Sequence, residues 1–587
     1  YARIEYGTTT GYGSTTTLAT TPAKNYSVNI ASLTSDTAYH YRIITLDMAG
    51  NQYTSQDYTV TTLIAGSITP ALVITAEIIP ASGNPILRIR GTDSIDSIKI
   101  TQDSSGIILT SGSVTQTFTP NLSSIEIYGF DGNDTITIAS SVTVAANVYA
   151  GAGDDKIFVN NFEFSILDGG DGNDLLVSIG GIANTLTGGT GLDSIWCDTS
   201  DTITDVSSDE ATYQTIHQVS RFYQPFSTDP ANIDYVSLAL AGQSLRDPVA
   251  SYSYSNYASL PLFRDMPEYN DIRQGSLGDC YFLAVLASLA QPDPAYGSIS
   301  PGILLQSIAP LGDGTFGVRF YRSGVENYLR IDADLTTGYA KMGPDNELWV
   351  ALLEKAYAYF RYGSNSYSSL DGGWMSTVYG ELSGGSSATQ WTGGAETTLF
   401  NYLQGGLVAG HAVTLGSYSG ASGPIVGGHS YSLRSTEIID GVQYATVYNP
   451  WGYDGRTYDS NPSDGLLTLT MAQMQLYFSA VCVSQVPIGG IEDAYVGLEP
   501  YTGQSFVQQQ IIRSNAYMEM TAAEGRAGDL SEILAPPAKD YNMYPVIRIP
   551  GHASEAYNYL KGNRITASEY IILGNYWSIL EEDTLQY

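Results

Sequence analysis

The chain has 587 residues, of which 43% are hydrophobic, and its 59 acidic and 25 basic residues give a formal net charge of −34 at pH 7. This length indicates several domains, roughly three to five, and the hydrophobic content is sufficient for buried cores. The negative charge argues against nucleic acid and anionic membranes as partners and leaves divalent cations as candidate ligands. No run of 18 apolar residues occurs, so we expect no membrane-spanning helix.

Residues 1–64 alternate apolar and polar positions between short turns, as half-buried antiparallel strands do. Residues 39–44, followed by Ala49-Gly50-Asn51, resemble the later strands of a fibronectin type III domain, which implies a β-sandwich. The first strands of such a domain are missing. Because the chain also starts at Tyr1 inside a strand pattern, we expect it to be a fragment or a processed form of a longer protein.

Residues 65–200 contain a Gly- and Asp-rich repeat, whose copies are residues 129–134, 150–155, 169–174 and 188–193. The last aspartates of the copies are 21, 19 and 19 residues apart, and each copy leads into a short strand with one inward apolar residue: Ile136, Ile157, Leu176 and Ile195. Asp96 lies 38 residues before Asp134, which equals two periods and suggests earlier coils. The pattern predicts a parallel β-roll or β-solenoid.

This repeat resembles the Gly-Gly-x-Gly-x-Asp motif of RTX-type β-rolls, which implies bound Ca²⁺. Glycines allow the tight turn, and carboxylates of stacked turns can complete an oxygen cage. The candidate ligands are Asp131, Asp134, Asp154, Asp155, Asp171, Asp174 and Asp193. Phe130 and Ala150 replace glycines, and Leu192 predicts a weaker fourth site. A solenoid that stacks without metal is the alternative.

Residues 201–245 lack clear periodicity and are interpreted as a connector. Residues 246–486 have a mixed α/β pattern, and residues 487–587 form a C-terminal region of unknown role with a helical pattern at 517–534.

The loop from Asp271 to Asp279 precedes an apolar helical run that begins at Cys280. A thiol in the first turn of a helix meets free N–H groups and the helix dipole, which favour a thiolate. Gln274 supplies a neutral donor on the approach to this loop. The alternative is a buried structural cysteine. The other two cysteines, Cys197 and Cys482, form no disulfide framework with it and no zinc motif.

His429 is the best candidate for a base among five histidines, because Asn449-Pro450-Trp451-Gly452 follows it at the end of a strand. The Asn449 carbonyl can hold an imidazole in one tautomer, and Trp451 can shield that bond from water. No comparable segment follows the remaining four histidines. His40 is predicted to be structural and His411 to pack in a strand, while His217 lies in the connector and His552 beyond the end of the domain.

Five ordered segments over about two-fifths of the chain resemble the calpain family of cysteine proteases. They are residues 274–283, 347–358, 428–433, 449–452 and 464–469. The resemblance implies an α+β papain-like core with two lobes, here about 246–365 and 366–486. Cys280 would then be the nucleophile, His429 the base and Asn449 its orienter. Gln274 and the Cys280 N–H would bind the oxyanion, with Trp451 as a shield.

The same resemblance implies Ca²⁺ in both lobes of the core. Asp271 and Glu354 are the candidate ligands of the first lobe, although Asp271 could instead cap a turn; Asp454, Asp459 and Asp464 are candidates in the second lobe. Tyr281 stands where the family usually has tryptophan, and no C2-like or EF-hand region is recognisable.

The sequence therefore predicts a multidomain protein: a β-sandwich, a parallel β-roll and a papain-like protease core. We expect a calcium-dependent cysteine endopeptidase that cleaves protein substrates and is secreted or attached to a bacterial surface, where surface or matrix components are further candidate partners. One alternative is a non-catalytic, calcium-stapled adhesion or matrix protein with a decayed protease domain. Another is transglutaminase-like acyl transfer, which Asn449 disfavours because that class usually has Asp in this place.

Overall fold

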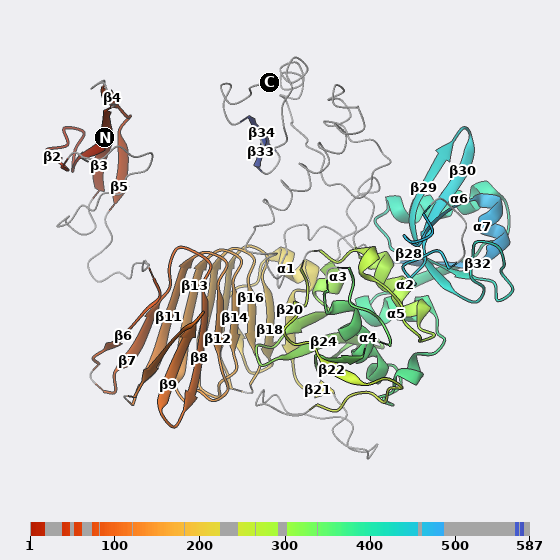
Figure 1. Cartoon of the computed structure of the whole chain (residues 1–587), viewed down its shortest axis with the longest axis horizontal. Helices are drawn as coiled ribbons and strands as arrows, with labels where there is room; N and C mark the ends of the chain where they lie inside the picture. Colours follow the sequence, from red (N-terminus) through yellow and green to blue (C-terminus); the bar gives the residue numbers. More distant parts are fainter. Residues whose placement is uncertain are drawn as a thin grey trace. The chain divides into compact units, whose positions relative to one another are not determined.

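The structure is a computed structural model of the whole chain (Figure 1). It describes residues 2–17, 38–46, 52–61, 73–81, 83–119, 121–180, 182–223, 245–264, 266–290, 302–336, 338–344, 346–455, 461–485, 570–573 and 576–579. The chain divides into two compact units, Tyr1–Ala71 and Leu72–Tyr587.

The first unit contains one antiparallel sheet, in which β3 pairs with β1, β4 and β5, and β1 also pairs with β2. Its strands are β1 (Ala2–Gly7), β2 (Ser14–Thr15), β3 (Ala38–Leu46), β4 (Gln52–Thr54) and β5 (Tyr58–Thr61). The described residues of this unit hold no second sheet. The sandwich therefore remains a prediction from the resemblance.

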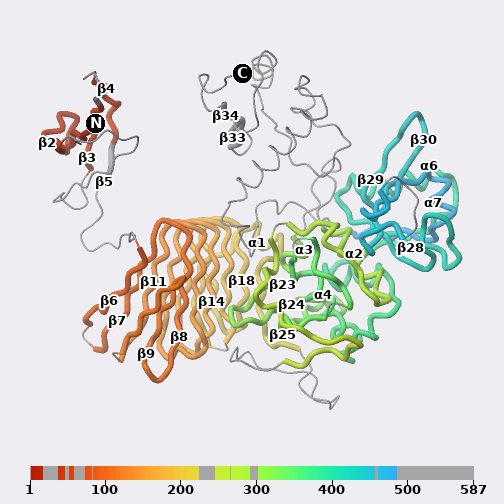
Figure 2. The backbone as a smooth tube through the Cα atoms, viewed as in Figure 1, coloured from red at the N-terminus to blue at the C-terminus, as the bar shows by residue number. Residues whose placement is uncertain are grey.

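A β-solenoid opens the second unit, and its two parallel sheets run side by side in Figure 2. One sheet contains β8 (Ser97–Asp103), β12 (Thr135–Ile138), β14 (Lys156–Val159), β16 (Leu175–Ser178), β18 (Ser194–Asp198) and β20 (Ile216–Val219). The other contains β7 (Ile86–Arg90), β11 (Ser124–Asp131), β13 (Ala145–Ala152), β15 (Ile166–Asp171), β17 (Thr185–Thr190) and β19 (Thr202–Ile203). Antiparallel strands cover the first coil: β6 (Thr75–Ile79), β9 (Gly106–Ser111) and β10 (Val114–Phe118).

The solenoid core follows from the two-residue period of its strands. In β12, for example, two isoleucines point inward and two threonines outward. The four apolar residues that follow the repeats, Ile136, Ile157, Leu176 and Ile195, pair in register from coil to coil and are fully buried. Each coil thus buries its apolar face on the next coil.

The solenoid continues beyond residue 200, into the segment interpreted as a connector. Residues 201–223 contain β19, helix α1 (Ser208–Tyr213), β20 and β21 (Phe222–Tyr223). A capping box at Ser207 starts α1. Residues 224–244 lie outside the described part.

Lobe I of the next domain is built around two helices that are buried on nearly every side, α2 (Cys280–Leu289) and α4 (Trp349–Phe360). Around them lie α3 (Gly302–Leu305), α5 (Met375–Ser383), β22 (Tyr254–Asn256), β23 (Ile308–Pro310), β24 (Thr315–Arg322), β25 (Val325–Asp332), β26 (Asp334–Thr336) and the 3₁₀ turns η2 (Tyr269–Asp271) and η4 (Tyr367–Leu370). Helix α5 packs against α2 and β24 and also contacts β27 and β32, so it lies between the two expected lobes.

Lobe I and the solenoid share an apolar cluster. Strand β21 leaves the solenoid and pairs in parallel with β25. Trp196 lies at the centre of this junction, fully buried, with its ring 4.3 Å from His217 and 5.8 Å from Tyr328. The other members include Phe158, Leu175, Val177, Phe222, Ala309 and Leu311.

Polar contacts cross the same junction. The Gln306 Oε1 atom of lobe I lies 2.9 Å from both Ser194 Oγ and His217 Nε2. Asn160 Nδ2 donates to the Leu311 carbonyl at 3.0 Å. These side chains are buried, so the solenoid is docked on lobe I over a specific interface.

Lobe II is a six-stranded sheet in the order β27-β32-β28-β29-β30-β31. Its elements are β27 (Ser387–Trp391), α6 (Glu396–Val408), β28 (Val413–Ser417), β29 (Ser430–Ile439), β30 (Val442–Tyr448), β31 (Leu466–Thr470), α7 (Met471–Tyr477) and β32 (Phe478–Ser484). Beyond residue 485 the described part is one hairpin, β33 (Tyr570–Leu573) and β34 (Tyr576–Ile579), and the helix expected at 517–534 lies outside it. No helix in the described ranges is long and apolar enough to span a membrane.

Candidate active site

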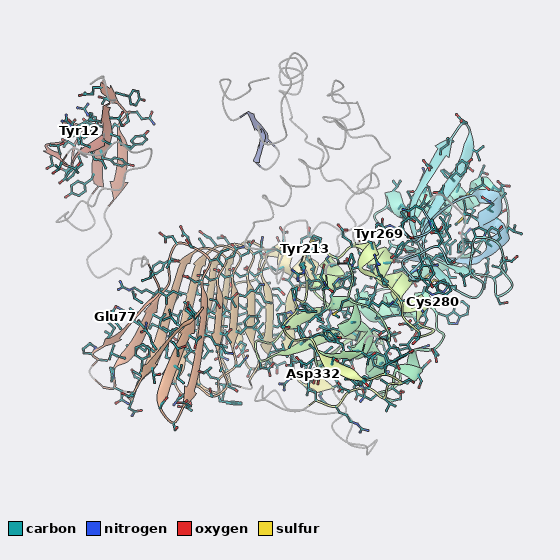
Figure 3. All side chains as sticks on the ribbon, in the orientation of Figure 1. Tyr12, Glu77, Tyr213, Tyr269, Cys280 and Asp332 are labelled. Carbon is teal, nitrogen blue, oxygen red and sulfur yellow. The ribbon has the colours of Figure 1, made fainter. Side chains whose placement is uncertain are left out.

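Cys280 is the first residue of α2, as the sequence predicts, and it lies where lobe I meets lobe II (Figure 3). Burial raises the pKa of its thiol, and this effect exceeds the opposing help from Ser430 and from the N–H of Tyr281. The Ser430 main chain and hydroxyl both favour the thiolate. The lowered pKa expected from the helix end alone is therefore not realised in this state.

His429 is held by Asn449 through a hydrogen bond between their side chains. Its Nε2 atom donates to Asn449 Oδ1 at 2.8 Å, and the Trp451 N–H reaches the same oxygen at 3.1 Å. An Nε2–H tautomer, inferred from this bond, leaves Nδ1 free to accept a proton. Burial lowers the pKa of His429 to about 4, with the Asn449 bond opposing the shift. The Trp451 ring lies 4.9 Å from the imidazole.

The two lobes meet through direct contacts around the cysteine and the histidine. Helix α2 packs against β29, Gln274 N donates to the Pro450 carbonyl at 2.8 Å, and the Tyr448 hydroxyl donates to the Ile272 carbonyl at 2.8 Å. No hydrogen bond joins the Cys280 thiol to His429 within the described ranges. Both residues are thus positioned at the lobe interface but not yet paired.

Gln274 does not present its amide to an oxyanion position in this state. Its Nε2 atom donates to the Leu277 carbonyl at 2.6 Å and to Asp279 Oδ1 at 3.0 Å. Its Oε1 atom is buried without a partner among the described residues. Both amide hydrogens are therefore engaged inside the loop that leads to Cys280.

Asp271 and Glu354, the expected calcium ligands of lobe I, have different partners. Asp271 Oδ2 accepts from the Glu268 N–H at 2.7 Å, which is the turn-capping alternative. Glu354 accepts from the Ala340 N–H at 3.0 and 3.1 Å and faces Asp279. Burial raises the pKa of Glu354 well above its usual range and that of Asp279 to about 6, so this pair retains a proton.

The candidates in lobe II are dispersed. Asp454 is fully buried, Asp464 accepts from Leu466 N and Asn461 Nδ2, and Asp459 lies outside the described residues. His411 bonds the Ser484 carbonyl, which agrees with a packing role, and His552 is not in the described part.

The last aspartates of the solenoid repeats form a continuous ladder. The Oδ1 atom of each accepts the main-chain N–H of the aspartate one coil earlier, at 2.6–2.9 Å. The ladder runs through Asp96, Asp134, Asp155, Asp174 and Asp193. Glu210 of α1 ends it by accepting from Asp193 N at 3.1 Å.

The other carboxylate oxygen of each ladder aspartate, Oδ2, faces oxygen atoms of the neighbouring turns. Oδ2 of Asp134, Asp155, Asp174 and Asp193 is buried without a hydrogen bond among the described residues. A methyl group added to Gly169 would lie 2.2 Å from Asp174 Oδ2 and 2.6 Å from the Gly188 carbonyl, so both oxygens face one point beside that glycine. Converging oxygens of this kind fit Ca²⁺. At the matching place next to Asp155, Ala150 supplies a real methyl group.

The remaining solenoid candidates lie outside this buried column. Asp131 and Asp171 are exposed, and Asp154 is half-buried. Asp154 Oδ1 accepts from Asn173 N at 2.9 Å, and Asp171 Oδ1 from Thr190 Oγ1 at 2.7 Å. These three aspartates lie in the turns, but their carboxylates do not belong to the buried set of unpaired Oδ2 atoms.

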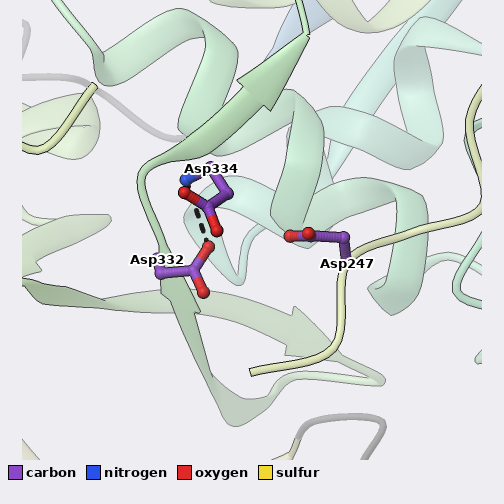
Figure 4. A group of neighbouring side chains, drawn as sticks. All are labelled: Asp247, Asp332 and Asp334. Carbon is purple, nitrogen blue, oxygen red and sulfur yellow. Dashed lines mark hydrogen bonds between the residues drawn. The ribbon is translucent and has the colours of Figure 1, made fainter. Parts of the chain in front are cut away.

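One further acidic cluster was not anticipated. Asp247, Asp332 and Asp334 of lobe I lie close enough together to hold a cation (Figure 4). The Lys355 ammonium already fills this place, 2.6 Å from a carboxylate oxygen of both Asp247 and Asp332. The cluster is therefore satisfied by the protein's own charge.

Two residues near the nucleophile escaped the sequence analysis. Ser430 acts on the Cys280 thiol, and its signal was available because it directly follows His429. Asp371 Oδ1 accepts from the Gly278 N–H at 2.9 Å. Its position 93 residues away gave no indication of this contact.

Comparison with known proteins places residues 255–467 in the family described as calpain family cysteine protease. Calpain-type cysteine protease DEK1 of Zea mays is 27% identical over 263 residues, which are 38% of this chain and 12% of that protein. Human calpain-9 is 31% identical over 214 residues, and the human calpain-2 catalytic subunit is 29% identical over 213; each match covers 33% of this chain and 30% of the relative. The chain thus spans less than a third of the length of these relatives.

Proposed function

Because residues 255–467 belong to the calpain family of cysteine proteases, we propose that the chain is a cysteine endopeptidase acting through Cys280, His429 and Asn449. The observation that carries this proposal is the His429–Asn449 bond of 2.8 Å, made at the lobe interface where Cys280 starts α2. This bond fixes the imidazole with Nδ1 free, as a base for a thiol requires.

In the proposed reaction the Cys280 sulfur attacks the scissile carbonyl carbon while its proton passes to His429 Nδ1. The imidazolium then returns this proton to the leaving amine, and water hydrolyses the thioester. The Cys280 N–H at the helix start can donate to the oxyanion. Trp451 keeps water from the bond between His429 and Asn449.

Two adjustments bring the described state to a reactive one. The thiol and His429 must come into hydrogen-bond contact, because the buried thiol favours its neutral form. Gln274 must release Leu277 or Asp279 before its amide can donate to an oxyanion. A small movement of lobe II against lobe I would accomplish the first, and rotation of the Gln274 side chain the second.

We further propose that Ca²⁺ binds the solenoid, where the Oδ2 atoms of Asp134, Asp174 and Asp193 would hold it with neighbouring carbonyls, whereas the Ala150 methyl group occupies the matching place beside Asp155. The cation would supply charge compensation to carboxyls whose pKa burial raises to about 7 or 8. Calcium ligation by Asp271 and Glu354, and a secreted or surface-attached location, remain proposals from the resemblance.

The test is to label Cys280 with an epoxide thiol inhibitor, with and without Ca²⁺, and to follow casein cleavage. Cys280→Ala should abolish both labelling and cleavage, while Cys482→Ala, which removes a free and more deeply buried thiol of lobe II, should retain them. Cleavage by folded Cys280→Ala would refute the nucleophile. Equal activity before and after exhaustive chelation would refute calcium dependence alone.

A further inference from the structure

A bulge in strand β29 directs one arginine of lobe II toward the helix that carries the nucleophile. Leu433 and Ser435 of β29 face successive residues of β30, so Arg434 between them is the extra residue of the strand. A bulge turns such a residue away from the regular alternation of its neighbours. The Arg434 side chain crosses to lobe I, where its Nη1 atom donates to the Ala287 carbonyl of α2 at 3.2 Å.

The same guanidinium lies on an aromatic ring of lobe I. Its central carbon is 4.2 Å from the centre of the Tyr269 ring, which is the distance of a cation–π contact. Tyr269 begins η2, which leads into the loop before Cys280, and its ring also contacts Tyr448 of lobe II at 4.8 Å. A planar guanidinium can stack on a ring and donate at once, which an ammonium reproduces only in part. Arg434 therefore holds two segments of lobe I with one side chain.

The bond to Ala287 also suits the electrostatics of α2. This helix ends at Leu289, so the Ala287 carbonyl is one of the last four, which have no donor within the helix. Partial negative charge collects at this end and favours a cation, while the positive end of the same helix carries Cys280. Arg434 thus binds α2 at the end remote from the thiol.

Strand β29 and helix α2 are consequently joined at two places. Ser430, the first residue of β29, acts on the Cys280 thiol, and Arg434 reaches Ala287. The two elements run in the same direction between these contacts, over about 13 Å of strand and about 10 Å of helix. His429 directly precedes the strand. A shift of β29 along α2 would move the imidazole relative to the sulfur, and the Arg434 contacts oppose this shift.

We propose that Arg434 is a positioning residue, which aligns His429 with the Cys280 sulfur by fixing the register of β29 on α2. Its guanidinium contacts the far end of α2 and not the reacting atoms. The inference rests on the proposed protease function, because it gives Arg434 a role in pairing the thiol with its base. Loss of the contact should therefore impair the chemical step more than substrate binding.

The first test examines the thiol without turnover. Alkylation of Cys280 by iodoacetamide is followed by mass spectrometry across a range of pH. A thiolate paired with an imidazolium reacts at lower pH than a free thiol, so Arg434→Met should need a higher pH for the same rate. Arg434→Lys, which keeps a cation and a donor, should fall between Arg434→Met and the unmodified protein.

Arg322→Met is the matched control for this profile. Arg322 makes the same two kinds of contact, a bond to the Phe360 carbonyl at the end of α4 and a position 4.5 Å from the centre of the Phe360 ring. Both contacts lie inside lobe I, so Arg322→Met should leave the alkylation profile of Cys280 unchanged.

The second test measures kcat and KM for casein-derived peptides, with the melting temperature of each variant as a check on folding. Arg434→Met should lower kcat about tenfold or more and leave KM within about twofold. Arg434→Gln, whose shorter side chain ends before the Ala287 carbonyl, should behave alike and takes its place if Arg434→Met does not fold.

An alkylation profile or a kcat that stays unchanged in these folded variants, while the unmodified protein cleaves, overturns the inference. A profile that depends on Arg434 in a protein that cleaves no peptide refutes the proposed protease function and leaves the positioning role standing.

Discussion

Replacing Trp196 with alanine tests whether the solenoid and lobe I are one cooperative body. The indole is fully buried between β18 and lobe I. A buried tryptophan removes on the order of 200 Å² from water, worth about 5 kcal/mol at about 25 cal/mol per Å². Large-to-small changes in cores cost about 3–5 kcal/mol. We expect a loss of about 4 kcal/mol from the free energy of unfolding at this junction.

Hydrogen exchange resolved by peptide is the suitable assay, because it reports local stability in each element. A loss of about 4 kcal/mol corresponds to roughly a thousandfold lower protection where the junction limits opening. The decrease should occur in β16 and β18 of the solenoid and, by a similar factor, in β24 and β25 of lobe I. The reason is that Trp196 contacts Tyr328 and borders Gly317.

Ile127→Ala is the matched control, since Ile127 is equally buried but lies in the solenoid core at β11. In a solenoid each coil contacts only its neighbours, so this change should lower protection around β11 and leave β24 and β25 as they were. If Trp196→Ala affects β16 and β18 while β24 and β25 keep full protection, the solenoid and lobe I are independent and the reasoning is refuted.

Three further outcomes are expected. Asn449→Ala should lower kcat about 100-fold with little change in KM, because His429 loses its orienting bond; an unchanged kcat would contradict this. Lys355→Met should cost about 3–5 kcal/mol in a denaturant titration, since Asp247 and Asp332 lose their cation; an unchanged midpoint would contradict it. Without divalent cations, the solenoid should lose thermal stability as pH rises from about 4 to about 8. The carboxyls of the folded ladder keep their protons over this range, since the pKa of Asp174 is about 8. The same carboxyls release their protons above about pH 4 in the unfolded chain, so rising pH favours unfolding. Added Ca²⁺ should remove this loss in a calorimetric scan, and stability that rises over the same window would be the opposite result.

The sequence predicts those features that depend on local pattern and order. The regular aspartate spacing predicts the stacked coils, since one coil must bury its face on the next, and the ladder of Asp134, Asp155 and Asp174 follows. The contact between His429 and Asn449 is one that the sequence order suggests, and Cys280 starts α2 at the same lobe interface.

The docking of the solenoid on lobe I could not be derived in this way, because it joins residues more than 100 positions apart, such as Ser194 and Gln306. One signal was present: β12 alternates Thr and Ile, whereas Leu175 to Val177 is apolar on both faces, as in a strand that is covered twice. The orientation of Gln274 depends on its neighbours Leu277 and Asp279 in three dimensions, for which the sequence carries no pattern.

The regular coils of the solenoid also give the protein an adjustable length. The ladder advances by 19 residues in its later steps and ends at a separate cap, Glu210 of α1. In the described part of the chain, the apolar cluster shared with lobe I involves the solenoid strands from β14 onward. Duplicating one earlier coil would therefore separate the first hairpins from the protease domain by one more strand spacing, about 4.8 Å. Neither end would need to change. The number of coils therefore sets the distance between the first hairpins of the solenoid and the protease domain, which packs on the last coils.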